Sequence, residues 1–401
     1  MESTELVRGI TTAADTATAT SEAVRTARGQ LTDPDSVELA VVFASAIHDV
    51  ETIVDTVREQ LGPIKLFGST TAGEFTDDRV TSGGLAVGLI ASDHLHIETA
   101  LADGVSEDIF GTVERAVADL PETAEMDGEY TAAVTVHSGL TGKGEQISLV
   151  TNQVLGDIPL AGGSAGDDLG MEQTLVFTED GIADDGVAIA VLSGDQPFGL
   201  GVEHGHEPIS ETYEVTRAEE NIIYELGGEP AFDVWKREVA AVAAAEYGID
   251  VDSLTAEDRE LFDLLTRFEL GVPIADGAHK IRWPGMTDRT TGPLAVATAV
   301  PEGTEVRITH SPTEAQIDSA QNAAEQALAE FEGDGLAGAL VFDCGCREII
   351  LGSEFDRAVE GIADVLPAQF VGFETYGEVC MPPDSASGYH NATTSVLLLP
   401  E

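Results

Sequence analysis

Positively charged residues are scarce in this chain. Lysine and arginine together number 19 among 401 residues, against 73 aspartates and glutamates, and only four of the 19 are lysines. A protein that binds nucleic acid needs clustered lysine and arginine to neutralise phosphates. The sequence contains no such cluster, so we expect no DNA or RNA partner.

Long apolar runs and cysteines are also scarce. The sequence has no apolar run of ~18 residues, the length that a membrane helix needs, and residues 1–30 contain no apolar segment typical of a signal peptide. Three cysteines are too few for a secreted disulfide framework. These absences predict a cytoplasmic protein without membrane insertion.

The excess of acid is large but is spread through the whole chain. The formal net charge is -54, whereas the hydrophobic content of 43% is ordinary for a globular protein. Self-repulsion of this size falls at high salt, since the Debye length drops from ~10 Å at 0.1 M to ~3 Å at 1 M. We interpret the acidity as adaptation to the salt-rich cytoplasm of a halophile.

One pattern occurs twice at identical spacing. The residues Pro63, Gly68, Thr71, Gly73 and Glu74 recur as Pro367, Gly372, Thr375, Gly377 and Glu378. A degenerate third copy runs from an apolar segment at 134–136 to Asp167. Each copy reads as helix, strand, helix, strand, acidic turn and strand. The pattern predicts an α/β protein with mixed sheets built from repeated strand-helix-strand units and with helices packed on the sheets.

The order of these segments suggests two domains. Residues 218–226 have helical periodicity and end on Gly227-Gly228, which we take as the boundary. Residues 239–246 and 256–268 also read as helices, the second opened by Thr255 with Asp258 three positions on. We therefore expect an N-terminal helical segment at 1–36, a first domain at 37–227 and a second domain at 228–401.

The acidic turns are the first candidate binding site. Glu74, Asp167 and Glu378 each follow a glycine after a strand, where ligands commonly bind in α/β sheets. We expect equivalent loops to meet and form one composite pocket, with hydroxyl groups from Thr71, Ser164 and Thr375. The alternative is structural: the glycine provides an unusual φ, and the acid caps nearby backbone.

Two further motifs indicate chemistry less clearly. The run Gly162-Gly163-Ser164-Ala165-Gly166 has the spacing of a hydrolase nucleophile, but a strand rather than a helix is expected after it. A serine or cysteine hydrolase is therefore a minor alternative. Cys344 and Cys346, with Arg347 and Cys380 near them, could bind zinc or serve in redox chemistry, although a buried structural cysteine is the simpler interpretation.

Three histidines are candidate haem ligands. His204 and His206 flank a glycine after a predicted strand, and His390 lies near the C-terminus. A histidine at the end of a strand is more often a hydrogen-bonded structural residue than an axial ligand. We therefore expect no cofactor, with a haem-binding gas sensor as the alternative.

Taken together, these segments resemble the FIST (F-box and intracellular signal transduction) sensory family. The matching residues are 42–45, 68–74 and 159–167 in the first half; Val215-Thr216, Asn221, Glu225-Leu226, Gly228, Pro230 and Ala231 at the junction; and Phe342-Asp343-Cys344, Gly372-Phe373, Tyr376-Gly377-Glu378, His390-Asn391 and Thr393 in the second half.

This resemblance implies FIST N and FIST C domains over nearly the whole chain and an intracellular sensor without catalytic activity. The ligand implied is an amino acid or related metabolite, and some relatives look like haem-bound nitric-oxide sensors. The chain ends directly after its last strand, so we expect a separate output partner. The expected ligand-binding residues are Thr71, Glu74, Ser164, Asp167, Arg347, Thr375, Tyr376, Glu378 and Asn391.

Overall fold

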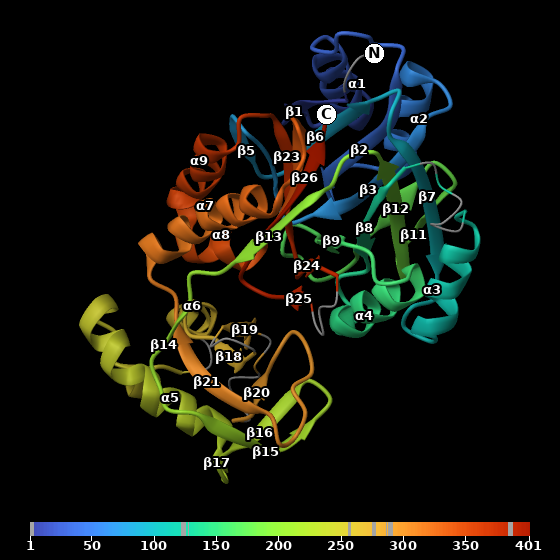
Figure 1. Ribbon diagram of the computed structural model, residues 1–401. Helices are drawn as coiled ribbons and strands as arrows, with labels where there is room; N and C mark the ends of the chain where they lie inside the picture. The colour runs from blue at the N-terminus through green and yellow to red at the C-terminus, as the bar shows by residue number, and fades with distance from the viewer. Residues whose placement is uncertain are drawn as a thin grey trace.

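The computed structural model describes residues 4–121, 126, 128–255, 258–274, 278–285, 287, 292–383 and 388–401. Three six-stranded sheets and one sheet of eight strands make up the described β structure. Helices cover the sheets, as Figure 1 shows. The mixed α/β class and the two-domain organisation predicted from the sequence are confirmed.

The first sheet is formed mainly by the N-terminal unit. Its strand order is β1 (Glu5–Thr11), β6 (Leu85–Ala91), β2 (Val37–Ser45), β3 (Lys65–Thr71), β10 (Val176–Thr178) and β11 (Gly181–Ala183). Only β2 and β3 pair in parallel, joined by α2 (Val50–Leu61). Helix α1 (Thr16–Arg28) lies beside α2, and apolar residues of both helices pack on this sheet. The segment 1–36 thus includes both β1 and α1.

The second sheet repeats this plan. Its order is β25 (Tyr389–His390), β24 (Glu378–Met381), β9 (Leu160–Ser164), β8 (Tyr130–His137), β12 (Gly186–Gly194) and β7 (His96–Asp103). The parallel pair is β8 with β9, joined by α4 (Gly144–Leu155). Helix α3 (Ile109–Ala118) packs beside α4.

The third sheet completes the set. Its order is β13 (Gly199–Glu203), β26 (Thr394–Pro400), β22 (Leu336–Cys344), β23 (Phe370–Thr375), β4 (Glu74–Thr76) and β5 (Arg79–Thr81). The parallel pair is β22 with β23. The helices on this sheet are α7 (Thr313–Glu330), α8 (Gly345–Leu351) and α9 (Phe355–Val365).

Each of these sheets ends in a hairpin that belongs to a different unit. The first unit gives β4 and β5 to the third sheet, the second gives β10 and β11 to the first sheet, and the third gives β24 and β25 to the second sheet. This cyclic exchange makes the three units equivalent around a pseudo-threefold axis. The repeat predicted the units themselves. It did not predict the exchange of hairpins, because the pairing of strands between units depends on tertiary contacts.

The inner faces of the three sheets share one apolar core. Phe43 of β2 packs against Phe373 of β23 with ring centroids 4.4 Å apart, and its ring lies 6.3 Å from that of Phe342 of β22. All three rings are fully buried. Such aromatic contacts between sheets fix how the units sit around the axis.

Residues 207–310 form an inserted module between β13 and α7, which Figure 1 shows below the three units. Its strands are β14 (Glu207–Pro208), β15 (Tyr213–Glu219), β16 (Ile222–Leu226), β17 (Glu229–Pro230), β18 (Leu270–Pro273), β19 (His279–Arg282), β20 (Leu294–Ala295) and β21 (Glu305–His310). Its helices are α5 (Ala231–Val242), which continues as a π turn at 243–247, and α6 (Arg259–Arg267). The module has its own apolar core around Trp235.

Residues 218–226 are not helical, so that prediction is wrong. They lie in β15 and β16, which form an antiparallel hairpin turned at Glu220, whose φ is 53°. The β-branched pair Ile222-Ile223 favours a strand. The boundary predicted at Gly227-Gly228 falls between β16 and β17, inside the inserted module.

The other two helix predictions in this region differ at their ends. Helix α5 begins at Ala231, well before the expected start at 239, and α6 begins at Arg259. Thr255 donates from its backbone N and its hydroxyl to the Asp258 carboxylate, at 2.6 and 2.8 Å. The predicted pair is therefore formed just before the helix rather than within its first turn.

Candidate ligand-binding site

The three turns that follow β3, β9 and β23 meet at the pseudo-threefold axis. Backbone hydrogen bonds join each unit to another: Ala72 N to Glu374 O at 2.9 Å, Ser164 N to Gly377 O at 2.8 Å, and Gly166 N to Thr70 O at 3.0 Å. The predicted convergence of the turns is therefore present in the structure. We call this region the turn junction.

Glu74 and Glu378 occupy matched, fully enclosed positions in the junction. Glu74 accepts hydrogen bonds from Thr71, Thr81 and the Gly84 N–H. Glu378 accepts from the Thr375 hydroxyl and from the N–H and hydroxyl of Thr393. Burial raises the pKa of each carboxyl to about 7, against the hydrogen bonds that favour its charged form. Both residues thus tie their own turn to a neighbouring strand.

Asp167 is not the structural counterpart of these two glutamates. Glu74 pairs with Phe373 of β23, and Glu378 pairs with Gly163 of β9. The corresponding pair of the first sheet is Val176 with Ser69. The second unit therefore carries an insertion between β9 and β10, and Asp167 lies within it. The equivalence inferred from spacing after Pro159 is wrong because that insertion shifts the register.

Asp167 instead stabilises the loop between β9 and β10. Its carboxylate accepts the backbone N–H groups of Met171, Glu172 and Gln173 at 2.9, 2.6 and 2.9 Å, and the hydroxyl of Tyr376. Asp168, Leu169 and Met171 all have positive φ, between 53° and 61°. Left-handed backbone at non-glycine residues is strained. The hydrogen bonds to the Asp167 carboxylate therefore stabilise a loop conformation that is unfavourable by itself.

A cavity of about 440 Å³ opens beside the turn junction. One wall is the loop 138–144 with the first turn of α4, a second is formed by Cys344, Cys346 and residues of the junction, and a third comes from the inserted module, including Trp283 and Ala297. Leu140, Leu169 and Met171 are exposed lining residues and mark its mouth. Ligand pockets usually measure ~300 to 1,000 Å³, so this cavity suits a small molecule.

Four of the nine expected binding residues line this cavity: Ser164, Thr375, Tyr376 and Asn391. Within the described part of the chain, the other five do not: Thr71, Glu74, Asp167, Arg347 and Glu378. That any of the nine binds a ligand stays a prediction.

Arg347 is engaged entirely inside the third unit. Its side chain is fully buried and donates to the Asp343 carboxylate at 2.7 Å, to the Ser319 hydroxyl at 2.9 Å, and to both the side-chain and backbone oxygens of Gln316. These contacts fix α8 against α7 and β22.

Several cavity residues were missed from the sequence. Lys143, Gln146, Trp283 and Tyr389 line the cavity although no motif marks them. The glycine-rich run 142–144 before α4 lacks the serine or threonine that a nucleotide-binding loop requires, so it gives no such signal. For Trp283 and Tyr389 the sequence carries no signal, since the cavity brings together units that are distant in the chain.

The first turn of α4 faces the cavity with its positive end. Within the described residues, no side chain caps this helix at Lys143. The carboxylate of Glu145, in the same turn, is paired with Lys280 at 2.7 Å and Arg282 at 2.9 Å. The backbone N–H groups of a first helical turn favour an anionic group, whereas the Lys143 ammonium donates to the Ser106 carbonyl at 2.6 Å.

Ser164 does not form a catalytic triad among the described residues. Its hydroxyl contacts the Tyr389 hydroxyl at 2.9 Å and lies 3.5 Å from both ring nitrogens of His137. An atom equally far from both nitrogens is not aligned with the lone pair of either. Burial also lowers the pKa of His137 to about 4, which makes it a poor base at neutral pH.

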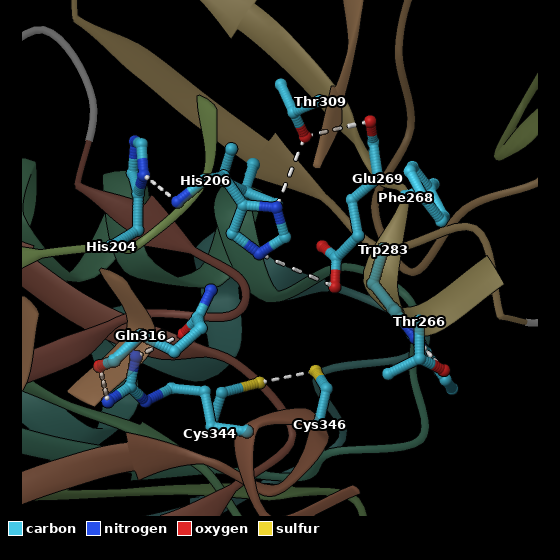
Figure 2. Close-up of polar contacts among 12 residues, drawn as sticks. His204, His206, Thr266, Phe268, Glu269, Trp283, Thr309, Gln316, Cys344 and Cys346 are labelled. Carbon is cyan, nitrogen blue, oxygen red and sulfur yellow. Dashed lines mark hydrogen bonds and ion pairs between the residues drawn. The ribbon is translucent and has the colours of Figure 1, made fainter. Parts of the chain in front are cut away.

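Among the described residues, none of the three candidate haem ligands lines the cavity, although His390 stands between the lining residues Tyr389 and Asn391. Both ring nitrogens of His204 are engaged, one with the His279 carbonyl and one with the His206 N–H. His206 meets Thr309 at 3.2 Å, and its other nitrogen is 4.0 Å from Glu269, as Figure 2 shows. Burial lowers the pKa of His206 and His390 well below the usual value. Haem binding stays the alternative to the expected absence of a cofactor.

Other site types find little support in the described residues. There, the structure places no three His, Cys, Asp or Glu side chains where they could hold a metal ion. In the same residues, no helix is both long and apolar enough to cross a membrane.

Fold and site together define an α/β protein of three repeated units with a cavity between the second unit, the third unit and the inserted module. The chain belongs to the FIST family: the FIST N domain matches residues 38–229, and the FIST C domain matches residues 231–381. FIST domains are a sensory family associated with signal transduction.

The similar proteins are themselves uncharacterised. A protein of Mycobacterium tuberculosis is 25% identical over 97% of this chain and 98% of its own length, and it occurs in both strains compared. A protein of Methanocaldococcus jannaschii is 22% identical over 48% of this chain, a match that spans only 39% of that protein.

Among solved structures, a cyanuric acid hydrolase from A. caulinodans aligns over 99% of both chains, with 11% identity and a TM-score of 0.30. A likeness of that size indicates neither the fold nor the activity of this chain.

Proposed function

We propose that this protein is an intracellular sensor that binds a small molecule in the cavity at the turn junction and acts through a separate output partner. The observation that carries the proposal is the cavity itself, because its walls come from the second unit, the third unit and the inserted module together. A ligand there contacts these three parts of the molecule at once. The sensory character of FIST domains supports the same function.

The chemistry of the walls favours an amino acid or a related metabolite. An anionic group is favoured at the first turn of α4, where backbone N–H groups lie at the cavity wall. On the wall from the third unit, Asn391 is 1% exposed, and its Oδ1 has no hydrogen-bond partner among the described residues. A buried acceptor without a donor is unfavourable in free energy. An ammonium or hydroxyl group of a ligand would donate the missing hydrogen bond to this oxygen.

The loop held by Asp167 is the route by which binding would be signalled. Leu169 and Met171 line the mouth of the cavity, and the Asp168 carboxylate accepts the Ser45 hydroxyl at 2.7 Å and the Ala46 N–H at 3.0 Å. A ligand that shifts this loop therefore also shifts the end of β2. A strained loop has another conformation close in free energy, which suits a two-state response.

Thermal unfolding with a panel of amino acids and related metabolites, in molar KCl, tests this function. A ligand present at ~100 times its Kd stabilises the folded protein by about 2.7 kcal/mol and raises Tm accordingly. Ala297→Trp fills the module side of the cavity and should abolish the shift, whereas Ala17→Trp on the exposed face of α1 should preserve it. An equal shift in both variants, or no shift from any compound, contradicts the proposal.

A further inference from the structure

Two thiols lie in contact on the wall of the cavity. The sulfurs of Cys344 and Cys346 are 2.8 Å apart, and both residues line the cavity. Figure 2 shows the pair, with Glu269 and Trp283 of the inserted module above it. Cys344 ends β22 and Cys346 belongs to α8, so the pair sits at a strand-to-helix turn.

The surroundings of the pair are apolar except for the buried carboxyl of Glu269, whose pKa is raised by burial and by the neighbouring Cys346. Cys344 and Cys346 pack with Ile281, Ala392 and Trp283 in a small cluster that joins the module to the third unit. The described residues around the pair offer no third side chain placed to complete a metal site. A contacting pair without further metal ligands is suited to thiol and disulfide chemistry.

We propose that Cys344 and Cys346 form a reversible dithiol site that is oxidised to a disulfide by low-molecular-weight disulfides entering the cavity. This site does not depend on the ligand of the proposed function. It adds a second input, the thiol redox state, at the same place in the fold.

The reaction is an ordinary exchange in two steps. The thiolate of Cys346 attacks one sulfur of the small disulfide; a mixed disulfide forms, and one small thiolate leaves. Cys344 then gives up its proton and attacks the Cys346 sulfur, which releases the second small thiolate. The two protons of the dithiol end on the two small thiols, while the protein loses two electrons and the small disulfide gains them.

Geometry permits the bridge without a large movement. Residues two positions apart at a turn have Cα atoms ~5 to 6 Å apart, within the ~4.4 to 6.8 Å range of disulfides. The sulfurs already touch, so closing the bond requires small changes in the side-chain torsions.

Exposure sets the order of attack. Cys346 is 8% exposed and Cys344 is 2% exposed, so an oxidant in the cavity reaches Cys346 first. Burial and the neighbouring Cys346 thiol raise the pKa of Cys344 well above its usual value, which disfavours Cys344 as the first thiolate. Cys380 lies on β24, and burial raises the pKa of its thiol to about 12.

Oxidation changes the cavity wall. The dithiol has two S–H groups, one of which donates to the other sulfur, so one donor is left for a ligand, whereas a disulfide has none. A ligand that accepts a hydrogen bond from this wall would bind one redox form better than the other. The protein would then report both a metabolite and the thiol redox state.

The test is alkylation and mass spectrometry of the whole chain after equilibration with mixtures of oxidised and reduced glutathione. In denaturant, the fully reduced chain should take up maleimide at all three cysteines. Oxidised protein should take up one, at Cys380, and the peptide that holds Cys344 and Cys346 should be lighter by two hydrogens. Dithiothreitol should restore all three sites. Three alkylated cysteines at every glutathione ratio, or a disulfide or adduct at Cys380, would overturn the proposal.

Single variants test the order of attack. Cys344→Ser removes the second thiol, so glutathione should remain trapped on Cys346. Cys346→Ser should react at least tenfold more slowly, since only the less accessible Cys344 is left. Cys380→Ser should behave as the wild type apart from the missing alkylation. Equal rates in the first two variants would contradict the assignment of Cys346 as the attacking thiol.

Discussion

The buried carboxyl of Glu378 should make stability fall as the pH rises. Its pKa is raised from 4.5 to about 7 by burial. The folded state therefore holds a proton that the unfolded state releases between these values. The stabilisation is complete below pH 4.5 and is lost as the pH rises through 7. Glu378→Gln removes this loss because an amide does not ionise.

The size of the effect follows from the raised pKa. A difference of about 2.5 in pKa, at ~1.36 kcal/mol per unit, amounts to about 3 kcal/mol for a group with no exposed surface. The amide oxygen of glutamine can keep both hydrogen bonds from Thr393, and its NH₂ group faces the Thr375 hydroxyl. At pH 5 the variant and the wild type should thus agree within ~1 kcal/mol. At pH 8 the variant should be more stable by about 2 to 3 kcal/mol.

Urea unfolding followed by circular dichroism at pH 5, 6, 7 and 8, in constant molar KCl, measures this difference. Urea keeps the ionic strength fixed, so repulsion among the surface acids affects both proteins equally. Glu74→Gln should repeat the result, because burial gives Glu74 the same raised pKa. Glu51→Gln, on the exposed side of α2, serves as the control. Unfolding curves for Glu378→Gln that run parallel to the wild type from pH 5 to 8 would refute the reasoning.

Three further outcomes are expected. Asp167→Asn leaves one of four donors unpaired and should lower the free energy of unfolding by about 1 to 3 kcal/mol. Hydrogen exchange at the amides of Met171, Glu172 and Gln173 should become faster. Unchanged exchange at these amides would contradict the role assigned to the Asp167 carboxylate. Arg347→Met leaves Asp343 buried without its cation and should lower the free energy of unfolding, measured in urea, by about 3 to 5 kcal/mol. A decrease of less than ~1 kcal/mol would contradict the role assigned to this buried ion pair. Lowering KCl from ~2 M to ~0.1 M should lower Tm because the net charge is -54, and a Tm independent of salt would argue against a halophilic protein.

Much of the architecture could be predicted because it is local. The paired patterns ending at Glu74 and Glu378 identified the two units that match in the structure, since Pro, Gly and hydrophobic periodicity fix a strand, helix and turn within one stretch of chain. The residues 218–226 were misread because short apolar runs fit a helix or a strand equally well.

What depends on contacts between units could not be predicted. The hairpin β4 and β5 pairs with β23, a strand almost 300 residues further along the chain, and no local signal specifies that partner. The same holds for the cavity. Ser164 and Thr375 were found through the repeat, whereas Tyr389 and Trp283 reach the cavity only through the exchanged hairpin β24 and β25 and the inserted module.

A crystal structure of the protein with a compound that raises its Tm tests the central claim most directly. The account predicts ligand density in the cavity, with an anionic group at the first turn of α4 and a donor group within hydrogen-bond distance of Asn391 Oδ1. Density at any other place in the molecule, with the cavity filled only by solvent, would contradict it.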